Sequence, residues 1–223
     1  MAQDMYGPMT GPSAWMMTPV WGWRHIFLLW LMWAVMMAAM MLPSAMPLLS
    51  LYDAALRKRA GAGSAGLRVY AMAGGYLLTW AAFSVGATAL QRLLARALVL
   101  NPMMEMPGRT AVGITLLLAG LYQLTPWKAT CLRQCRSPLG FIVQRWRNGT
   151  GGAGLMGLEH GAYCLGCCWA LMLLLFAGGV MNLTIIVGLT AIVLIEKVTP
   201  VGVAVSRALG VGLIAGGAWF LVR

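Results

Sequence analysis

Long apolar runs, separated by shorter polar or basic stretches, make up most of the chain after residue 25. A helix needs about 20 mostly apolar residues to cross a bilayer, and most of the runs match or approach that length. The pattern predicts six membrane helices, at about 26–49, 69–90, 110–124, 155–180, 183–195 and 201–222. The fifth run is short and the break before the sixth is modest, so five spans are the alternative.

The ends of two of these helices depend on prolines. Pro43 and Pro47 are expected to kink the first helix or end it early, because proline removes a backbone donor and clashes with the preceding turn. The third helix has an alternative end at Cys131, which it reaches if Pro126 does not break it. A further short segment, at 138–147, mixes apolar residues with arginines and is expected to lie as a helix on the membrane surface.

The polar segments divide the chain and set its orientation. Residues 1–25 are expected to form an N-terminal tail, and residues 26–223 a single transmembrane helical domain. The loops after the first and third helices lie on one side in the six-helix layout, and both are basic. Their basic residues are Arg57, Lys58, Arg59, Arg68, Lys128, Arg133, Arg136, Arg145 and Arg147. The positive-inside rule makes that side cytoplasmic, so both chain ends are expected to face outward.

Composition supports the same class of protein. Of the 223 residues, 61% are hydrophobic and 9% are charged, whereas soluble domains carry about 25% charged residues. So few charges do not cover the surface of a soluble fold, and we predict an all-α, polytopic integral membrane helix bundle. The net charge of +11 is typical of basic loops beside anionic lipid, so we expect membrane lipid and no nucleic acid as a partner.

The segment "HGAYCLGCCW", within the fourth predicted helix, carries the strongest candidate chemistry. His160, Cys164, Cys168 and Met172 follow one another at intervals of four residues, so they share one helix face, and Cys167 lies at its edge. Imidazole, thiol and thioether groups are ligands for soft or borderline metals, namely Cu(I), zinc or an iron–sulfur centre. The alternative is that the cysteines pack as small hydrophobic residues.

Glu159, beside that face, is expected to support the site as a partner of His160 or as a further ligand. The cysteine count of five is odd. An odd number argues against a complete disulfide framework and leaves metal binding or reactive thiols open.

Cys131 and Cys135 form a second thiol pair at the predicted cytoplasmic end of the third helix. If the segment is helical, both thiols point the same way. The fourth helix begins on that same side, and Cys164 lies roughly 14 Å along it at about 1.5 Å per residue. The two cysteine clusters are therefore expected in the same half of the membrane, as one site or as two.

Met36 and Met40 are candidate thioether ligands in the first helix. They continue an i, i+4 stripe that begins at Met32, and thioethers are soft ligands that suit Cu(I). The alternative is that these methionines fill gaps in the helix packing.

Two polar residues within or next to apolar runs are expected to support the site. Gln123 lies in the third helix, and Glu196 lies at the end of the fifth. Polar and charged groups are costly in a membrane and are usually paired or functional there. For Glu196 the alternative is a boundary pair with Lys197 that only marks the helix end.

With these residues in hand, the chain resembles a bacterial family of predicted metal-binding integral membrane proteins, often labelled copper chaperones. The resemblance extends over about residues 24–200 and rests on five blocks of sequence. They are "AMMLPSAMP", "YQLTPWKATCLRQCRSPLGF", "GLEHGAYCLGCCWALM", "GGVMN" and "EK". The resemblance implies that the chain binds a metal, with copper first, as a multi-pass protein of the bacterial inner membrane.

Three functions fit these observations. The first is a protein that binds Cu(I) through Cys, His and Met and hands it on, with a soluble metallochaperone or a copper-requiring protein as partner. The second is a membrane thiol–disulfide oxidoreductase, because Cys164 and Cys167 have the C-x-x-C spacing. The third is an accessory subunit with a structural zinc. The sequence carries no recognisable nucleotide-binding loop, so an ATP-driven pump is not expected, and a redox role for the cysteines is the only enzymatic activity left open.

Overall fold

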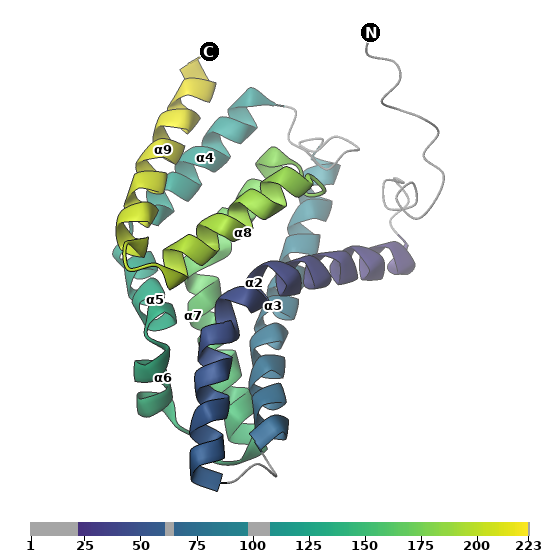
Figure 1. Ribbon diagram of the computed structural model, residues 1–223. Coiled ribbons are helices and arrows are strands. Elements are labelled where there is room, and N and C mark those ends of the chain that lie inside the picture. The colour runs from purple at the N-terminus through teal and green to yellow at the C-terminus, as the bar shows by residue number, and fades with distance from the viewer. Residues whose placement is uncertain (1–21, 61–64, 98–107, 223) are drawn as a thin grey trace.

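The computed structural model describes residues 22–60, 65–97 and 108–222, and within these ranges all regular structure is helical. The predicted N-terminal tail lies almost entirely outside them. The helices are α2 (Trp23–Ala60), α3 (Ala65–Arg96), α4 (Arg109–Gln123), α5 (Pro126–Arg136), α6 (Pro138–Arg145), α7 (Gly149–Gly178), α8 (Leu183–Val198) and α9 (Gly202–Val222) (Figure 1). The all-α class predicted from the sequence is confirmed.

Four of the described helices, α2, α3, α7 and α9, are long and apolar enough to cross a membrane. The helical segments concerned contain 37, 32, 30 and 21 residues. The other two helices predicted as spans, α4 and α8, have 15 and 16 residues, which is less than the usual span of about 20. The structure is thus compatible with a membrane protein, and the number of six spans stays a prediction.

Helix α2 continues through both of its prolines. The sequence predicts a kink or an early end near Pro43 and Pro47, yet the helix extends to Ala60. Figure 1 shows that it bends sharply near its middle, so that its N-terminal half diverges from α3 while its C-terminal half runs beside α3. Proline removes a backbone hydrogen bond and clashes with the carbonyl four residues earlier, and this accounts for a bend without ending the helix.

The third predicted helix is divided into α4 and α5, so its alternative extension to Cys131 is wrong. Helix α4 ends at Gln123, and Thr125 caps α5 by accepting a hydrogen bond from the Lys128 amide. Pro126 favours an extended conformation at Thr125, which has ψ of 148°, and it occupies the first turn of α5. The break gives α5 a direction of its own, and α5 packs against α7.

Glycines let the long helices approach each other closely. A Cβ atom added at Gly157 of α7 would collide with the Met72 carbonyl group of α3. A Cβ atom at Gly120 of α4 would lie 2.8 Å from the Gly210 carbonyl oxygen of α9. Small residues permit such contacts between membrane helices. The resulting pairs, α3 with α7 and α4 with α9, form the two halves of the bundle.

Helix α7 is the central element. In its most apolar 18-residue stretch 56% of the residues are buried, against 17% in that of α9, and it contacts α3, α4, α5 and α8. Its cysteines therefore lie inside the bundle rather than on its outer face.

The two basic loops meet at one end of the bundle. The Arg59 guanidinium lies 4.5 Å from the centre of the Trp146 ring, and α2 packs against the short helix α6. This arrangement is the one that the six-helix layout predicts for the two basic stretches. Which side of the membrane this end faces stays a prediction.

Candidate thiol-rich metal site

Three cysteines lie near the middle of α7, and a fourth approaches them from α5. Cys164, Cys167 and Cys168 are each 1% exposed, and all five cysteines of the chain are free thiols. The Cys167 Sγ lies 3.2 Å from the Cys168 Sγ and 3.8 Å from the Cys135 Sγ. We call Cys135, Cys164, Cys167 and Cys168 the thiol cluster. The structure thus brings together two segments that the sequence left as one site or two.

Cys131, the remaining cysteine, packs at the edge of this cluster. Its Sγ lies against the backbone of α7, because a Cβ atom added at Gly166 would be only 2.7 Å from it. The Tyr122 hydroxyl donates a hydrogen bond to the Gly166 carbonyl oxygen at the same place. Burial raises the pKa of the Cys131 thiol, and interaction with the buried Cys164 raises the pKa of Cys135 well above its usual range. Both shifts favour the neutral thiol over the thiolate.

Cys164 is in contact with a lysine side chain from α8. The Lys197 Nζ lies 2.7 Å from the Cys164 Sγ and 3.2 Å from the Ser44 Oγ of α2. The Tyr76 hydroxyl lies 3.0 Å from the same sulfur and 3.0 Å from the Met41 carbonyl oxygen. Side chains of α3 and α8 thus contact this thiol, and α2 contacts both of these side chains. An ammonium at this distance stabilises a thiolate relative to a thiol.

Glu196, the neighbour of Lys197, points to a different partner. Its carboxylate oxygens lie 2.8 and 3.0 Å from the Lys128 Nζ. The Gln123 Nε2 donates to the same carboxylate at 3.2 Å, and Lys128 also donates to the Gln123 amide oxygen. Glu196 and Lys128 are each 1% exposed. The alternative of a boundary pair between Glu196 and Lys197 is therefore wrong, since each residue is buried with a separate partner.

His160 lies one turn before Cys164 and is buried among aromatic rings. Its ring centre is 5.9 Å from that of Tyr76 and 5.1 Å from that of Phe141. Within the part of the chain that the structure describes, its Nδ1 has no hydrogen-bond partner. A buried imidazole nitrogen in this state is available to a metal ion. Glu159, by contrast, forms an ion pair with Arg147 at 2.8 Å and faces the loop between α6 and α7.

The candidate methionines belong to the same apolar core as the cysteines of α7. Met40 and Met172 are buried in the same apolar cluster as the three cysteines of α7, and Met36 packs against that cluster from α2. Shared burial is weaker evidence for a ligand than a contact between donor atoms. These three residues are accordingly secondary candidates.

The sulfur spacing fits a soft metal ion, although the site is not complete. Two sulfurs bound to one tetrahedral ion at about 2.3 Å lie about 3.8 Å apart, as Cys135 and Cys167 do. Among the described residues, no three His, Cys, Asp or Glu side chains form a ready group around one ion. Binding of one ion by three or more of these side chains therefore requires them to move closer together.

Three polar residues of this region were not predicted from the sequence as part of the site: Ser44, Tyr76 and Lys128. Lys197 was noted as a charged residue, but its contact with Cys164 was not predicted. Tyr76 lies in an apolar helix, where a polar side chain usually faces the bundle interior. That rule would have placed it inside but would not have paired it with Cys164. Lys128 appeared only as one of the basic loop residues, since its ion pair spans 68 positions in the sequence.

Comparison with known proteins supports the resemblance noted from the sequence. The family model PpoB2, described as a copper chaperone, matches residues 30–220. No curated protein and no solved structure matches the chain. The matched range includes all five cysteines, His160 and both buried lysines. The chain therefore belongs to the PpoB2 copper chaperone family.

Proposed function

We propose that this protein is an integral membrane copper chaperone that binds Cu(I) at the thiol cluster and hands it on. The observation that carries the proposal is the meeting of Cys135 with the three α7 cysteines in a buried core. Thiolates are soft ligands and select Cu(I) over harder ions. The family name supports copper as the cargo.

The donors fall into an inner and an outer group. Cys164, Cys167, Cys168 and Cys135 form the inner group, because the Cys167 sulfur lies 3.2 Å from that of Cys168 and 3.8 Å from that of Cys135, and Cys164 is buried on the same stretch of α7. Cys131 and His160 lie next to it, and Met36, Met40 and Met172 are softer ligands on the path to or from it. Gln123 and Glu196 both bind Lys128 and so hold α4, α5 and α8 together. Glu159 forms ion pairs with Arg145 and Arg147.

Lys197 provides a way to hold and release the copper cargo. In the structure its ammonium occupies the place of a cation beside Cys164. The ammonium stabilises Cys164 as the thiolate that Cu(I) binds, and when copper binds this sulfur Lys197 moves toward Ser44, which it already contacts. The return of Lys197 then favours release of copper to a partner protein.

The membrane arrangement that goes with this function has six spans, with α4 and α8 in addition to the four long helices. The basic end, with Arg59 and Arg145, faces the cytoplasm, and both chain ends face outward. The membrane is the bacterial inner membrane. A soluble metallochaperone or a copper-requiring protein is the exchange partner.

The test is to purify the full chain anaerobically, measure bound metals by mass spectrometry and titrate free thiols. The proposal predicts near-stoichiometric copper in the unmodified protein and loss of copper in the Cys164→Ser/Cys168→Ser variant. Met46→Leu is the control, because it removes an exposed sulfur of α2 outside the thiol cluster. Copper that survives the double cysteine substitution would contradict the proposal, and tightly held zinc would favour a structural zinc site instead.

A thiol–disulfide oxidoreductase is the second candidate function. It is favoured by the 3.8 Å separation of Cys135 and Cys167, which lie on different helices. In that case the same purification would yield a metal-free protein with two reducible disulfides. The thiol titration therefore separates the two functions in one experiment.

A further inference from the structure

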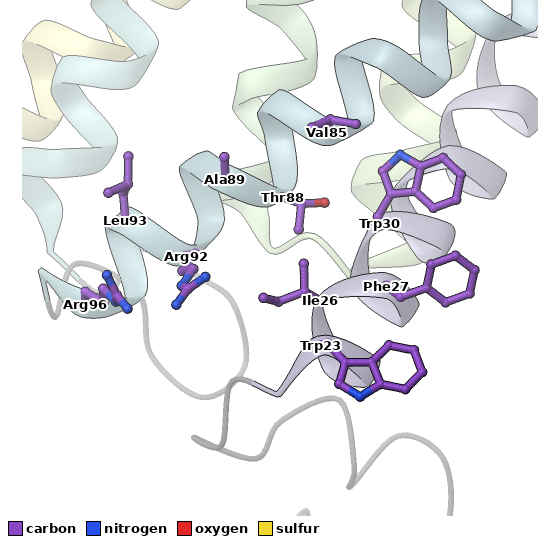
Figure 2. A pocket seen from close by; sticks show the side chains of 10 residues that line it. All are labelled: Trp23, Ile26, Phe27, Trp30, Val85, Thr88, Ala89, Arg92, Leu93 and Arg96. Carbon is purple, nitrogen blue, oxygen red and sulfur yellow. The ribbon is translucent and has the colours of Figure 1, made fainter.

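A groove of about 820 Å³ lies between the N-terminal half of α2 and the C-terminal half of α3, away from the thiol cluster (Figure 2). Trp23, Phe27 and Trp30 form its α2 wall. The α3 wall includes Arg92 and Arg96 among apolar side chains. None of the described residues that line the groove is acidic. The groove exists because α2 bends at its middle and its first half diverges from α3 (Figure 1).

We propose that this groove binds one anionic phospholipid, with an acyl chain along the aromatic wall and the headgroup phosphate at Arg92 and Arg96. This site is separate from the proposed copper site, and neither depends on the other. Its volume lies within the roughly 300–1,000 Å³ that is usual for small-molecule sites.

The two arginines are placed to bind one phosphate group. They are four residues apart near the end of α3, so they lie on the same face of the helix. Figure 2 shows both side chains at the same end of the groove. Guanidinium groups present several donors in a plane and bind phosphate oxygens with charge-assisted hydrogen bonds.

The other wall suits a hydrocarbon chain. Phe27 is 52% exposed and Trp23 is 74% exposed, so large apolar surfaces face the groove and the space outside the bundle. The Trp30 indole is fixed by a hydrogen bond to the Ala81 carbonyl oxygen at 3.1 Å, which holds that ring in place. Trp side chains are enriched at membrane–water interfaces. A free phosphate ion would leave this aromatic wall without a partner. A zwitterionic lipid carries a cation beside its phosphate, so it matches the charge of the two arginines less well than an anionic lipid does.

The test compares the thermal stability of the detergent-solubilised full chain with added phosphatidylglycerol or phosphatidylcholine of identical acyl chains. We expect phosphatidylglycerol to raise Tm by about 5 °C or more at a hundredfold excess over its Kd, and phosphatidylcholine to raise it by much less. The Arg92→Gln/Arg96→Gln variant should lose the difference between the two lipids. The matched control is Arg133→Gln/Arg207→Gln, which removes two exposed arginines elsewhere and should keep it.

Native mass spectrometry of the same samples gives a second readout that does not depend on the stability of the variant. One retained phosphatidylglycerol is expected in the unmodified protein and in the control, and none in the Arg92→Gln/Arg96→Gln variant. Equal shifts with both lipids, an equal shift with inorganic phosphate alone, or an unchanged preference in the double arginine variant would each overturn the lipid site. Copper content is expected to be the same in all these variants, so failure of this proposal is distinguishable from failure of the copper site.

Discussion

Two lysines are buried in this protein, and their partners differ in kind. Lys128 is 1% exposed and lies 2.8 Å from the Glu196 carboxylate. Lys197 is 7% exposed and lies 2.7 Å from the Cys164 sulfur. A carboxylate forms a complete ion pair with an ammonium. A cysteine sulfur, in contrast, can also bind soft metals. We therefore expect Lys128 to stabilise the fold and propose that Lys197 controls the chemistry of the site.

The largest effect is expected from removal of the carboxylate in the first pair. Glu196→Ala leaves the Lys128 ammonium buried without a counter-charge, which typically costs about 3–5 kcal/mol of unfolding free energy. Thermal or denaturant unfolding in detergent measures it. Asp53→Ala is the control, because it breaks the solvent-exposed pair with Arg57 and is expected to leave stability nearly unchanged. An unfolding curve for Glu196→Ala that coincides with that of the control would refute the structural role of the first pair.

The second pair is broken by Lys197→Met, which removes the ammonium and keeps an unbranched side chain. We expect the apparent affinity for Cu(I) to fall by about 10–100-fold, the usual cost of losing a group that supports a metal ligand. Stability should change much less than in Glu196→Ala, since the remaining Cys164 becomes a neutral thiol. Competition with a Cu(I)-specific chelator under anaerobic conditions measures the affinity. A Lys197→Met variant that loses stability but keeps its affinity for Cu(I) would contradict the different roles assigned to the two lysines.

A smaller effect is expected at the tyrosine that contacts the same sulfur. Tyr76→Phe removes the hydroxyl that lies 3.0 Å from the Cys164 Sγ and from the Met41 carbonyl oxygen. We expect a loss of about 1 kcal/mol in stability and a decrease in copper affinity smaller than that of Lys197→Met. Tyr70→Phe serves as the matched control, because Tyr70 is 78% exposed. A decrease in affinity equal to that of Lys197→Met would mean that hydrogen bonding, rather than the ammonium charge, governs Cys164.

The smallest effect concerns a thiol whose pKa is set by burial. Because burial raises the pKa of Cys131, its alkylation rate should keep rising above about pH 8.5, where an unperturbed thiol is half ionised. Carbamidomethylation of the metal-free protein, read peptide by peptide with mass spectrometry across pH 7–10.5, tests this, with a free cysteine peptide as the reference. A rate for Cys131 that levels off together with the reference peptide would contradict the effect of burial on this thiol.

Much of the fold was predictable because run length and apolar content determine which segments are helical. The fourth predicted helix, at about 155–180, lies almost wholly within the observed α7, Gly149–Gly178. Periodicity also placed Cys164 and Cys168 on one face of that helix, where the structure buries both. The outcome at the prolines was harder to predict, since Pro126 begins a new helix while Pro43 and Pro47 lie within a continuous one.

The partners of the site could not be predicted from the sequence, because they depend on how distant helices meet. Lys197 and Cys164 are 33 positions apart and belong to different helices. From the sequence alone, Lys197 and Glu196 are simply adjacent charges at a helix end. They have different buried partners because their side chains leave α8 in different directions. Glu196 meets Lys128 of α5, and Lys197 meets Cys164 of α7.

X-ray absorption at the copper K-edge, recorded on anaerobically loaded full-length protein, tests the central claim most directly. The account predicts Cu(I) with a first shell made mainly of sulfur, and a loss of sulfur scattering when Cys164→Ser/Cys167→Ser is compared with the unmodified protein. A first shell of nitrogen and oxygen only, unchanged by these substitutions, would show that copper binds elsewhere and would contradict the account.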